Sequence, residues 1–271
     1  MQSADTSLPV QQGKDRVSNV RHLSQWIRTS YFWVAGVTVT FFCYLACIVV
    51  NLIAKFYPKY EHGRGVHRIA SVWGRSIIKM MPGWNVEISG QENLPKDYEA
   101  AVIVANHESM SDIWATYYLG IQFRWLSKDS VFKIPMIGHA MRWSGYIPIA
   151  RGNKSSHIDA MRQSADRIRK GIPMFFFPEG TRSVDGKVKE FKIGAFKLAQ
   201  DTQTAILPIA IHGAGDLMRK GSSHPSSKAT VRLKILPQIP PPEQSDNDLE
   251  RYAQKVREKI ITAHNTILGP S

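Results

Sequence analysis

Hydrophobic and polar positions divide the chain into an apolar N-terminal stretch and a longer part in which two periodicities alternate. No charged residue occurs between Arg28 and Lys55. As a helix, residues 31–54 would be about 36 Å long, more than the ~30 Å hydrocarbon core of a bilayer. The stretch starts too late and runs too long for a signal peptide, and no small-residue cleavage site follows it. The pattern therefore predicts a membrane helix.

Basic residues flank this stretch on both sides, so they give it no preferred orientation. The same balance suits a helical hairpin that enters and leaves through one leaflet. In the following segment, residues 66–81, apolar side chains form one helical stripe, which fits either a helix in the membrane interface or a helix packed in the core. A fully buried soluble helix at 31–54 is a further alternative. We assign residues 1–84 to an N-terminal membrane-associating helical region.

From residue 82 onward, short apolar runs alternate with amphipathic stretches. Strands are predicted at 85–89, 100–105, 121–126, 145–149, 172–177, 205–211 and 229–236, and helices at 110–119, 131–142, 155–170, 191–201 and 246–267. Such alternation is typical of an α/β fold. We therefore expect residues 85–271 to form an α/β domain, a mixed β-sheet flanked by helices.

Composition narrows the classes of partner. Among 271 residues, 43% are hydrophobic and 21% charged, which excludes a disordered chain. The net charge of +13 implies an anionic partner: nucleic acid, an anionic lipid surface or a phosphorylated substrate. The basic residues are spread over the whole length without a nucleic-acid-binding signature, which argues against nucleic acid. Cys43 and Cys47 fall on one helix face and are interpreted as small apolar side chains. The sequence therefore indicates neither a disulfide framework nor a structural zinc.

The polar segment 106–112 directly follows the apolar run 100–105, so His107 stands where a buried strand ends. Asp112 falls in the first turn of the next predicted helix and can fold back toward the imidazole. A carboxylate on one ring nitrogen fixes the tautomer and leaves the other nitrogen free to take a proton from a hydroxyl. Ser109 and Asp112 equally fit a helix capping box. The segment alone leaves catalysis and capping open.

A second polar segment follows the apolar run 172–177. Gly180 permits close backbone approach, Thr181 offers a hydroxyl, and Arg182 offers the fork geometry that fits phosphate oxygens. Glu179 is interpreted as a partner of Arg182 or as a contact to a polar headgroup. The segment indicates an anion site, and a turn with a solvated arginine has the same pattern.

Two more cations stand at predicted strand ends, Lys128 after 121–126 and Arg151 after 145–149. Ligands of α/β sheets bind at the carboxyl ends of strands. Together with Arg182 these cations would form a cationic pocket, whereas each taken singly fits an ordinary surface charge. His212, at the end of 205–211, is interpreted as a structural residue.

Four motifs now stand in a fixed order: His107 with Asp112, residues 145–151 (Gly-Tyr-Ile-Pro-Ile-Ala-Arg), residues 177–183 (Phe-Pro-Glu-Gly-Thr-Arg-Ser) and the Leu-Pro-Ile strand at 207–209. In this order they resemble the glycerolipid acyltransferase family, most closely its bacterial 1-acyl-glycerol-3-phosphate (lysophosphatidic acid) acyltransferases. The resemblance covers about residues 80–240, and N-terminal membrane helices are also usual in the family.

The resemblance implies roles by position. His107 would be the general base and Asp112 its orienting partner. The acceptor phosphate site would comprise Glu179, Gly180, Thr181 and Arg182 together with Arg151, and Lys128 is carried over more loosely. Glu108 stands where many relatives have Gln and adds a titratable group beside the base.

The implied reaction is direct acyl transfer from acyl-CoA or acyl carrier protein to the sn-2 hydroxyl of lysophosphatidic acid, giving phosphatidic acid. The chain lacks a Gly-x-Ser-x-Gly elbow, so no acyl-serine intermediate is expected, and the reaction needs neither cofactor nor metal. The expected setting is the bacterial inner membrane, with the catalytic domain on the cytoplasmic side and in contact with membrane phospholipids. The alternatives are a transacylase or acyltransferase with another lysophospholipid acceptor, a lipid hydrolase, and a non-catalytic lipid-binding protein.

Overall fold

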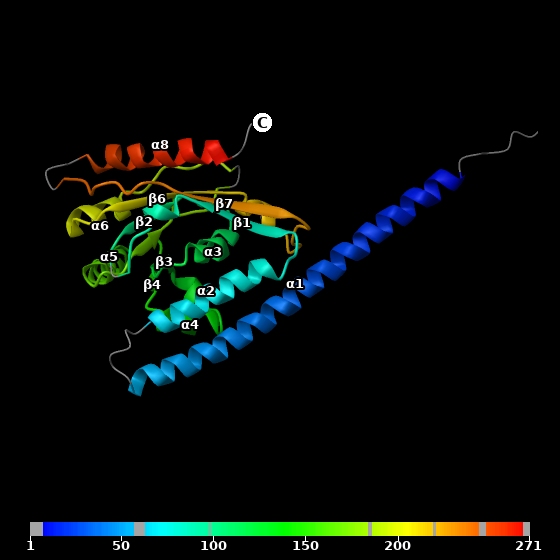
Figure 1. The fold of residues 1–271 in the computed structure, drawn as a ribbon, viewed down its shortest axis with the longest axis horizontal. Coiled ribbons are helices and arrows are strands. Elements are labelled where there is room, and N and C mark those ends of the chain that lie inside the picture. Colours follow the sequence, from blue (N-terminus) through cyan, green and yellow to red (C-terminus); the bar gives the residue numbers. More distant parts are fainter. Residues whose placement is uncertain are drawn as a thin grey trace, which may run out of the picture.

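A computed structural model describes residues 8–56, 63–97, 99–183, 186–218, 221–243 and 248–267, with side chains described from residue 22 onward. The chain has two parts (Figure 1). One long helix, α1 (Leu8–Phe56), extends as a single rod beyond an α/β part that holds the rest of the chain. Residues 246 and 247 of the last predicted helix lie outside the described residues.

A seven-stranded sheet forms the centre of the α/β part, with the strand order β1-β7-β6-β2-β5-β3-β4. All neighbouring pairs are parallel except β6 and β7, which are antiparallel, so the sheet is mixed as predicted. The strands are β1 (Trp84–Ser89), β2 (Val102–Ala105), β3 (Arg124–Lys128), β4 (Ile147–Ile149), β5 (Met174–Phe176), β6 (Ile206–His212) and β7 (Ala229–Ile235).

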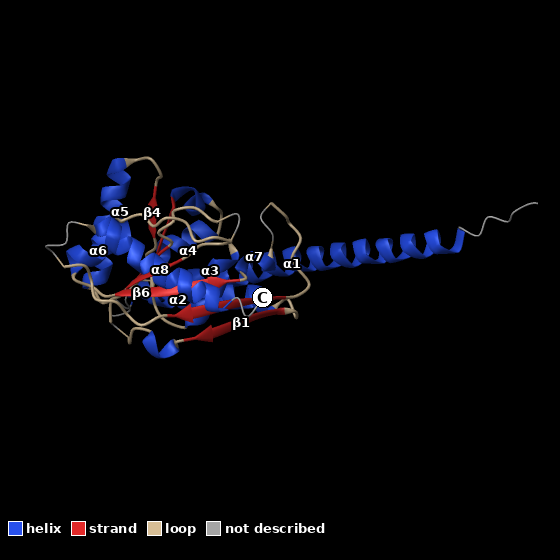
Figure 2. Cartoon of the chain, turned by 90° about the horizontal axis from the view of Figure 1, so that it is seen from above, coloured by secondary structure: helices blue, strands red, loops and turns tan. Residues whose placement is uncertain are grey.

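Helices cover both faces of this sheet (Figure 1), and the view from above shows α1 projecting beyond it (Figure 2). They are α2 (Arg64–Lys79), α3 (Ser111–Thr116), α4 (Ile137–Trp143), α5 (Lys154–Arg169), α6 (Gly194–Thr202), α7 (Ala214–Leu217) and α8 (Leu249–Ile267), and three short 3-10 helices lie at Gln91–Asn93, Tyr117–Leu119 and Asp129–Lys133. Apolar side chains of α2, α3, α4 and α7 pack on one face, and those of α5, α6 and α8 pack on the other. The alternation of β2 divides it between the two layers, because successive side chains of a strand point to opposite faces. Ile103 and Ala105 join the first core cluster, whereas Val102 and Val104 join the second.

Two predicted elements were placed wrongly. The strand predicted at 121–126 runs instead from Arg124 to Lys128, because its ladder begins where Arg124 pairs with β5 and ends where Lys128 pairs with β4. The helix predicted at 131–142 is broken. Pro135 disfavours helical backbone in the residue before it, and Ile134 is accordingly extended, with φ −70° and ψ 125°.

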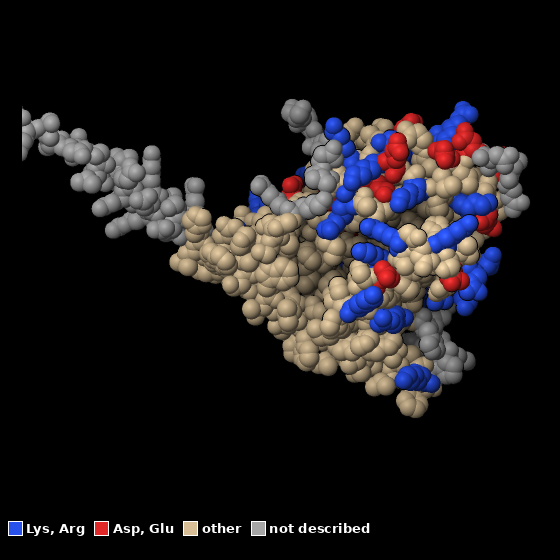
Figure 3. Space-filling model, turned by 180° about the vertical axis from the view of Figure 1, so that it is seen from behind, with Lys and Arg blue, Asp and Glu red and all other residues tan. Residues whose placement is uncertain are grey.

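Helix α1 presents many of its large apolar side chains outward. The segment His22–Phe56 is long and apolar enough to cross a membrane, and only 6% of its most apolar window is buried. Exposed large side chains include Trp26, Val34, Phe41, Phe42, Val49 and Phe56. Between Arg28 and Lys55 α1 has no charged side chain, and in the view from behind basic side chains gather over the α/β part (Figure 3). The alternative of a fully buried soluble helix is therefore wrong.

Helix α2 turns back along α1 and joins it to the domain (Figure 1). Its Ile77 and Ile78 belong to the core cluster on one face of the sheet, so the core interpretation of residues 66–81 is confirmed. Helix α1 is also tied to the loop before β7, where Arg28 Nε donates to the Pro225 carbonyl at 3.0 Å and Trp33 Nε1 donates to the Ser223 carbonyl at 2.9 Å. The apolar rod thus has a fixed position relative to the sheet.

Candidate active site

The predicted site residues follow the carboxyl ends of four neighbouring parallel strands. His107 follows β2, Lys128 ends β3, Arg151 follows β4, and the segment 177–183 follows β5. Because β2, β5, β3 and β4 are parallel neighbours, these ends lie along one edge of the sheet. The topology therefore brings together residues that lie far apart in sequence.

The imidazole of His107 is held by Asp112. The distance between His107 Nδ1 and Asp112 Oδ2 is 2.6 Å, with the aspartate fully buried and the histidine side chain 15% exposed. Nδ1 donates to the carboxylate, which leaves Nε2 available to a ligand. Burial raises the pKa of Asp112, and the hydrogen bond from His107 opposes this rise. A proton arriving on His107 would create an imidazolium beside this buried carboxylate and would be stabilised there.

The carboxylate that holds His107 also bonds to the start of helix α3. Asp112 Oδ2 also accepts hydrogen bonds from the backbone N–H groups of Glu108 at 2.8 Å and Ser109 at 2.9 Å. The bond to Ser109 is one arm of the predicted capping box. The hydroxyl of Ser109 accepts from the N–H of Ser111 at 3.3 Å, rather than from that of Asp112. The helix start is therefore part of what orients Asp112 toward His107.

Glu179 lies behind His107. Its side chain is buried, Oε1 accepts from the backbone N–H of His107 at 2.8 Å, and Oε2 accepts from that of Lys189 at 3.1 Å. Burial raises the pKa of Glu179, and these two N–H donors oppose the rise. A third bond, from Ser183 N to the His107 carbonyl at 2.8 Å, joins the same two loops. Glu179 thus fastens the loop after β5 to the loop that carries His107.

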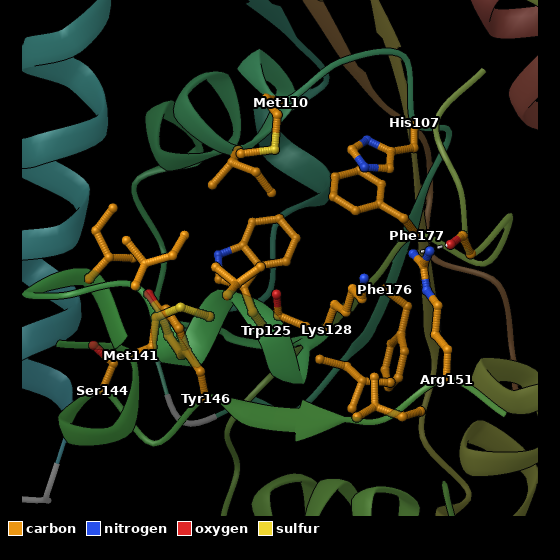
Figure 4. A pocket seen from close by; sticks show the side chains of 18 of the residues that line it. His107, Met110, Trp125, Lys128, Met141, Ser144, Tyr146, Arg151, Phe176 and Phe177 are labelled. Atoms are coloured by element: carbon orange, nitrogen blue, oxygen red, sulfur yellow. Dashed lines mark hydrogen bonds between the residues drawn. The ribbon is translucent and has the colours of Figure 1, made fainter. Parts of the chain in front are cut away.

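A ring of Phe177 supports the imidazole from one side. The ring centroids of His107 and Phe177 are 4.0 Å apart with an interplanar angle of 11°. The ring of Trp125 also stacks with that of Phe177, at a centroid distance of 5.4 Å. Figure 4 shows the histidine above the phenylalanine ring at one end of a cavity. The imidazole is consequently held both by its hydrogen bond and by its stacked neighbour.

Cations surround the turn at residues 180–182. A guanidinium N–H of Arg151 donates to the carbonyl of Gly180, and Lys189 Nζ donates to the carbonyl of Arg182 at 2.8 Å. Gly180 has φ +70°, a backbone conformation that favours glycine, and Lys192 lies against it. The side chains of Thr181 and Arg182 are exposed. The turn therefore presents backbone, hydroxyl and guanidinium groups to an anion.

Sequence reasoning missed two lysines of this turn, Lys189 and Lys192. They belong to a loop after the motif, and no local pattern distinguishes them from ordinary surface lysines. The chain folds back after the motif, where Lys192 N donates to the Pro178 carbonyl at 2.9 Å, and this brings both lysines close to residues 180–182.

One cavity of roughly 1150 Å³ collects most of the predicted site. His107, Lys128 and Arg151 line it, as do residues 180–182. Its remaining wall is largely apolar and includes Thr40, Cys43, Tyr44 and Cys47 of α1, Trp73 of α2, and Met141, Ser144 and Tyr146. His107 and Arg151 lie toward one side and the last three toward the opposite side (Figure 4). Asp112 and Glu179 do not line it and act through neighbours. The cavity therefore combines an imidazole, a cationic rim and an apolar interior.

Comparisons with known proteins agree with this arrangement. A family model described as Acyltransferase matches residues 85–212. A 1-acyl-sn-glycerol-3-phosphate acyltransferase of Chlamydomonas reinhardtii is 31% identical over 234 residues, covering 86% of this chain and 70% of the relative. The chain belongs to this acyltransferase family, as its motifs predicted.

Other relatives extend the comparison. The chloroplastic 1-acyl-sn-glycerol-3-phosphate acyltransferase LPAT1 of Arabidopsis thaliana is 38% identical over 214 residues, covering 79% of this chain and 59% of the relative. The crystal structure of the 1-acyl-sn-glycerophosphate (LPA) acyltransferase PlsC from Thermotoga maritima superposes with a TM-score of 0.75 at 25% identity, covering 93% of this chain and 99% of that one. The chain spans just under three fifths of the Arabidopsis protein that it matches. The α/β fold flanked by helices is confirmed.

Proposed function

We propose that this chain transfers an acyl group from a thioester to the sn-2 hydroxyl of 1-acyl-sn-glycerol-3-phosphate, giving phosphatidic acid for phospholipid synthesis. The observation that carries the proposal is the joint presence of the His107–Asp112 pair, a cationic rim and an apolar interior in one cavity. The names of the relatives supply the same substrate class.

In this reaction Nε2 of His107 removes the proton of the sn-2 hydroxyl as its oxygen attacks the thioester carbonyl. The new C–O ester bond forms, the C–S bond breaks, and the proton passes from His107 to the departing thiolate. Asp112 keeps Nδ1 protonated and stabilises the imidazolium in between. The proposed reaction uses no cofactor or metal, and the donor, acyl-CoA or acyl-acyl carrier protein, is a co-substrate.

The acceptor phosphate is proposed to bind at the cationic rim. Arg182 and Arg151 offer guanidinium groups, Gly180 and Thr181 offer a turn and a hydroxyl, and Lys128 lies on the same cavity wall. Glu179 contributes by positioning, since its carboxylate is used by backbone N–H groups. The apolar interior, walled in part by α1, suits an acyl chain that would otherwise lie in the bilayer.

A membrane location follows from the substrates and from α1. Both the acceptor and the product are lipids, and the outward apolar face of α1 suits lipid contact. The basic surface of the α/β part would attract anionic membrane phospholipids. We propose the inner membrane of a bacterium, with the domain on the cytoplasmic side where acyl thioesters are made.

The decisive experiment is a panel of acceptors and donors with the purified protein in detergent or vesicles. Mass spectrometry should detect phosphatidic acid from lysophosphatidic acid only when acyl-CoA or acyl-acyl carrier protein is present. Equal turnover with another lysophospholipid would assign a different acceptor. Product formed without a thioester donor would favour a transacylase or hydrolase, and no turnover with any thioester would favour a lipid-binding role.

A further inference from the structure

A second cluster of chemistry-bearing side chains lies beside the His107 loop but outside the cavity. It joins Glu108, from the loop after β2, to His212 at the end of β6 and His264 in α8. None of these three residues is among the described residues that line the cavity. The cluster is therefore not used by the proposed acyl transfer.

One possible ligand atom of each of the three side chains lies within 4.8 Å of the other two. His264 Nε2 lies 2.9 Å from Glu108 Oε1, His212 Nδ1 lies 3.4 Å from His264 Nε2, and His212 Nδ1 lies 3.7 Å from Glu108 Oε1. A neutral imidazole carries a single N–H. The proton on His264 Nε2 can thus be donated to Glu108 or to His212, but not to both. A cation at the common point would satisfy all three atoms together.

We propose that Glu108, His212 and His264 form a zinc site that fastens β6 and α8 to the catalytic loop. Zinc with bonds of about 2.05 Å in tetrahedral geometry holds its ligand atoms about 3.3 Å apart. The observed separations of 2.9, 3.4 and 3.7 Å lie around this value. An octahedral metal with bonds of about 2.1 Å would hold three facial ligands about 3.0 Å apart. The wider triangle favours zinc.

Burial and donor chemistry agree with this choice. The side chains of Glu108 and His264 are 10% and 9% exposed, and that of His212 is 24% exposed, which leaves the fourth position of the metal open to water. Two imidazoles and one carboxylate are typical zinc ligands, whereas magnesium and calcium prefer oxygen ligands. On binding, the N–H of His264 would move from Nε2 to Nδ1, because a ligating ring nitrogen carries no hydrogen.

The consequence for the protein is mechanical coupling. Glu108 follows the base His107 directly, and its backbone N–H donates to Asp112 Oδ2 at 2.8 Å. A metal on its side chain would hold this backbone from outside the cavity. The site is independent of the acceptor and donor that the enzyme takes, so it stands or falls apart from the proposed acyl transfer.

Zinc binding itself is the test. Protein purified without a polyhistidine tag and stripped with a chelator is titrated with Zn²⁺ against a chromophoric chelator. We expect one equivalent bound per chain, unaffected by millimolar Mg²⁺. His212→Ala and Glu108→Gln should each weaken binding roughly 100-fold or more. His22→Ala, which removes an exposed histidine of α1, is the matched control and should bind like the wild type.

A second readout guards against misfolded variants. Zn²⁺ should raise the Tm of the wild type and of His22→Ala but not that of His212→Ala. Glu108→Gln preserves shape and can still accept a hydrogen bond from His264, so its circular dichroism should match the wild type. Absence of stoichiometric Zn²⁺ binding, or equal affinity in the wild type and the two cluster variants, would overturn the proposal and leave a polar network.

Discussion

The backbone N–H of His107 donates a 2.8 Å hydrogen bond to the carboxylate of Glu179, a residue 72 positions further along the chain. Glu179, which the family resemblance assigns to the phosphate site, is therefore hydrogen-bonded to the backbone of the proposed base His107. Because Oε2 of the same carboxylate accepts from Lys189 N, Glu179 joins two loops through the main chain. The loop of the proposed base and the segment of the proposed phosphate site are therefore joined through the main chain.

Replacement of Glu179 should consequently affect kcat more than acceptor binding. In Glu179→Ala, the N–H of His107 loses its acceptor and the base is misplaced, which we expect to lower kcat by about 10- to 100-fold with little change in acceptor KM. Glu179→Gln keeps a carbonyl oxygen for His107 N and should retain more activity. A raised acceptor KM at unchanged kcat in Glu179→Ala would instead assign the carboxylate to substrate binding.

Removal of the base should abolish turnover without unfolding the protein. In His107→Ala we expect kcat to fall by at least ~10²–10⁴, the usual contribution of general-base catalysis. The side chain stacks on Phe177 but is not fully buried, so the Tm should change little. Steady-state assays are compared with thermal melts of the same preparation. Near-normal turnover in this variant would rule out the mechanism.

Arg182→Ala should weaken the acceptor selectively. Its guanidinium lines the cavity and is exposed, so the substitution removes a proposed phosphate ligand at small structural cost. We expect a raised acceptor KM, or a lowered kcat/KM for the acceptor, with donor kinetics nearly unchanged. Arg162→Ala is the matched control, since this exposed arginine of α5 pairs only with its neighbour Asp159 among the described contacts. A loss confined to donor kinetics would show that Arg182 does not serve the acceptor phosphate.

The sequence predicted the sheet and the site edge because both depend on local signals. Apolar runs ending in polar residues marked the strands, and the residues after them became the cavity rim. Periodicity did not reveal the burial of Arg124, a charged residue inside β3, or the break at Pro135. The orientation of Glu179 and the cluster of Glu108, His212 and His264 depend on segments that the fold brings together. No local sequence pattern could therefore predict them.

The cavity wall formed by α1 gives a prediction on acyl chain length. Cys43 is a small side chain that faces the cavity, so Cys43→Trp should fill part of its apolar volume. We expect the variant to prefer shorter acyl donors than the wild type in a competition of thioesters analysed by mass spectrometry. Val49→Trp places the same bulk on an outward position of α1 and should leave the preference unchanged. If Cys43→Trp had the same chain-length preference as the wild type, the acyl chain would not bind against this wall.

A buried histidine makes the fold sensitive to acid. His67 of α2 accepts a hydrogen bond at Nδ1 from the Tyr146 hydroxyl at 2.8 Å, and its Nε2–H donates to the Ile121 carbonyl at 3.2 Å. Burial, together with the charge of Arg124, lowers the pKa of His67 to about 3. The ordinary value is about 6.5, so between these pH values the unfolded chain binds a proton that the folded chain does not.

The free energy of unfolding should therefore fall as the pH drops below about 6.5, by up to about 1.4 kcal/mol per pH unit until pH ~3, and His67 should contribute no slope above that range. His67→Gln can preserve a donor and an acceptor while removing the titration. Its stability at pH 7 should be somewhat lower than that of the wild type, but its loss between pH 6 and 4 should be shallower. Denaturant titrations across this range measure both slopes. Parallel pH dependence in the two proteins would mean that acid acts on other groups, and that α2 is not held to the domain through a neutral His67.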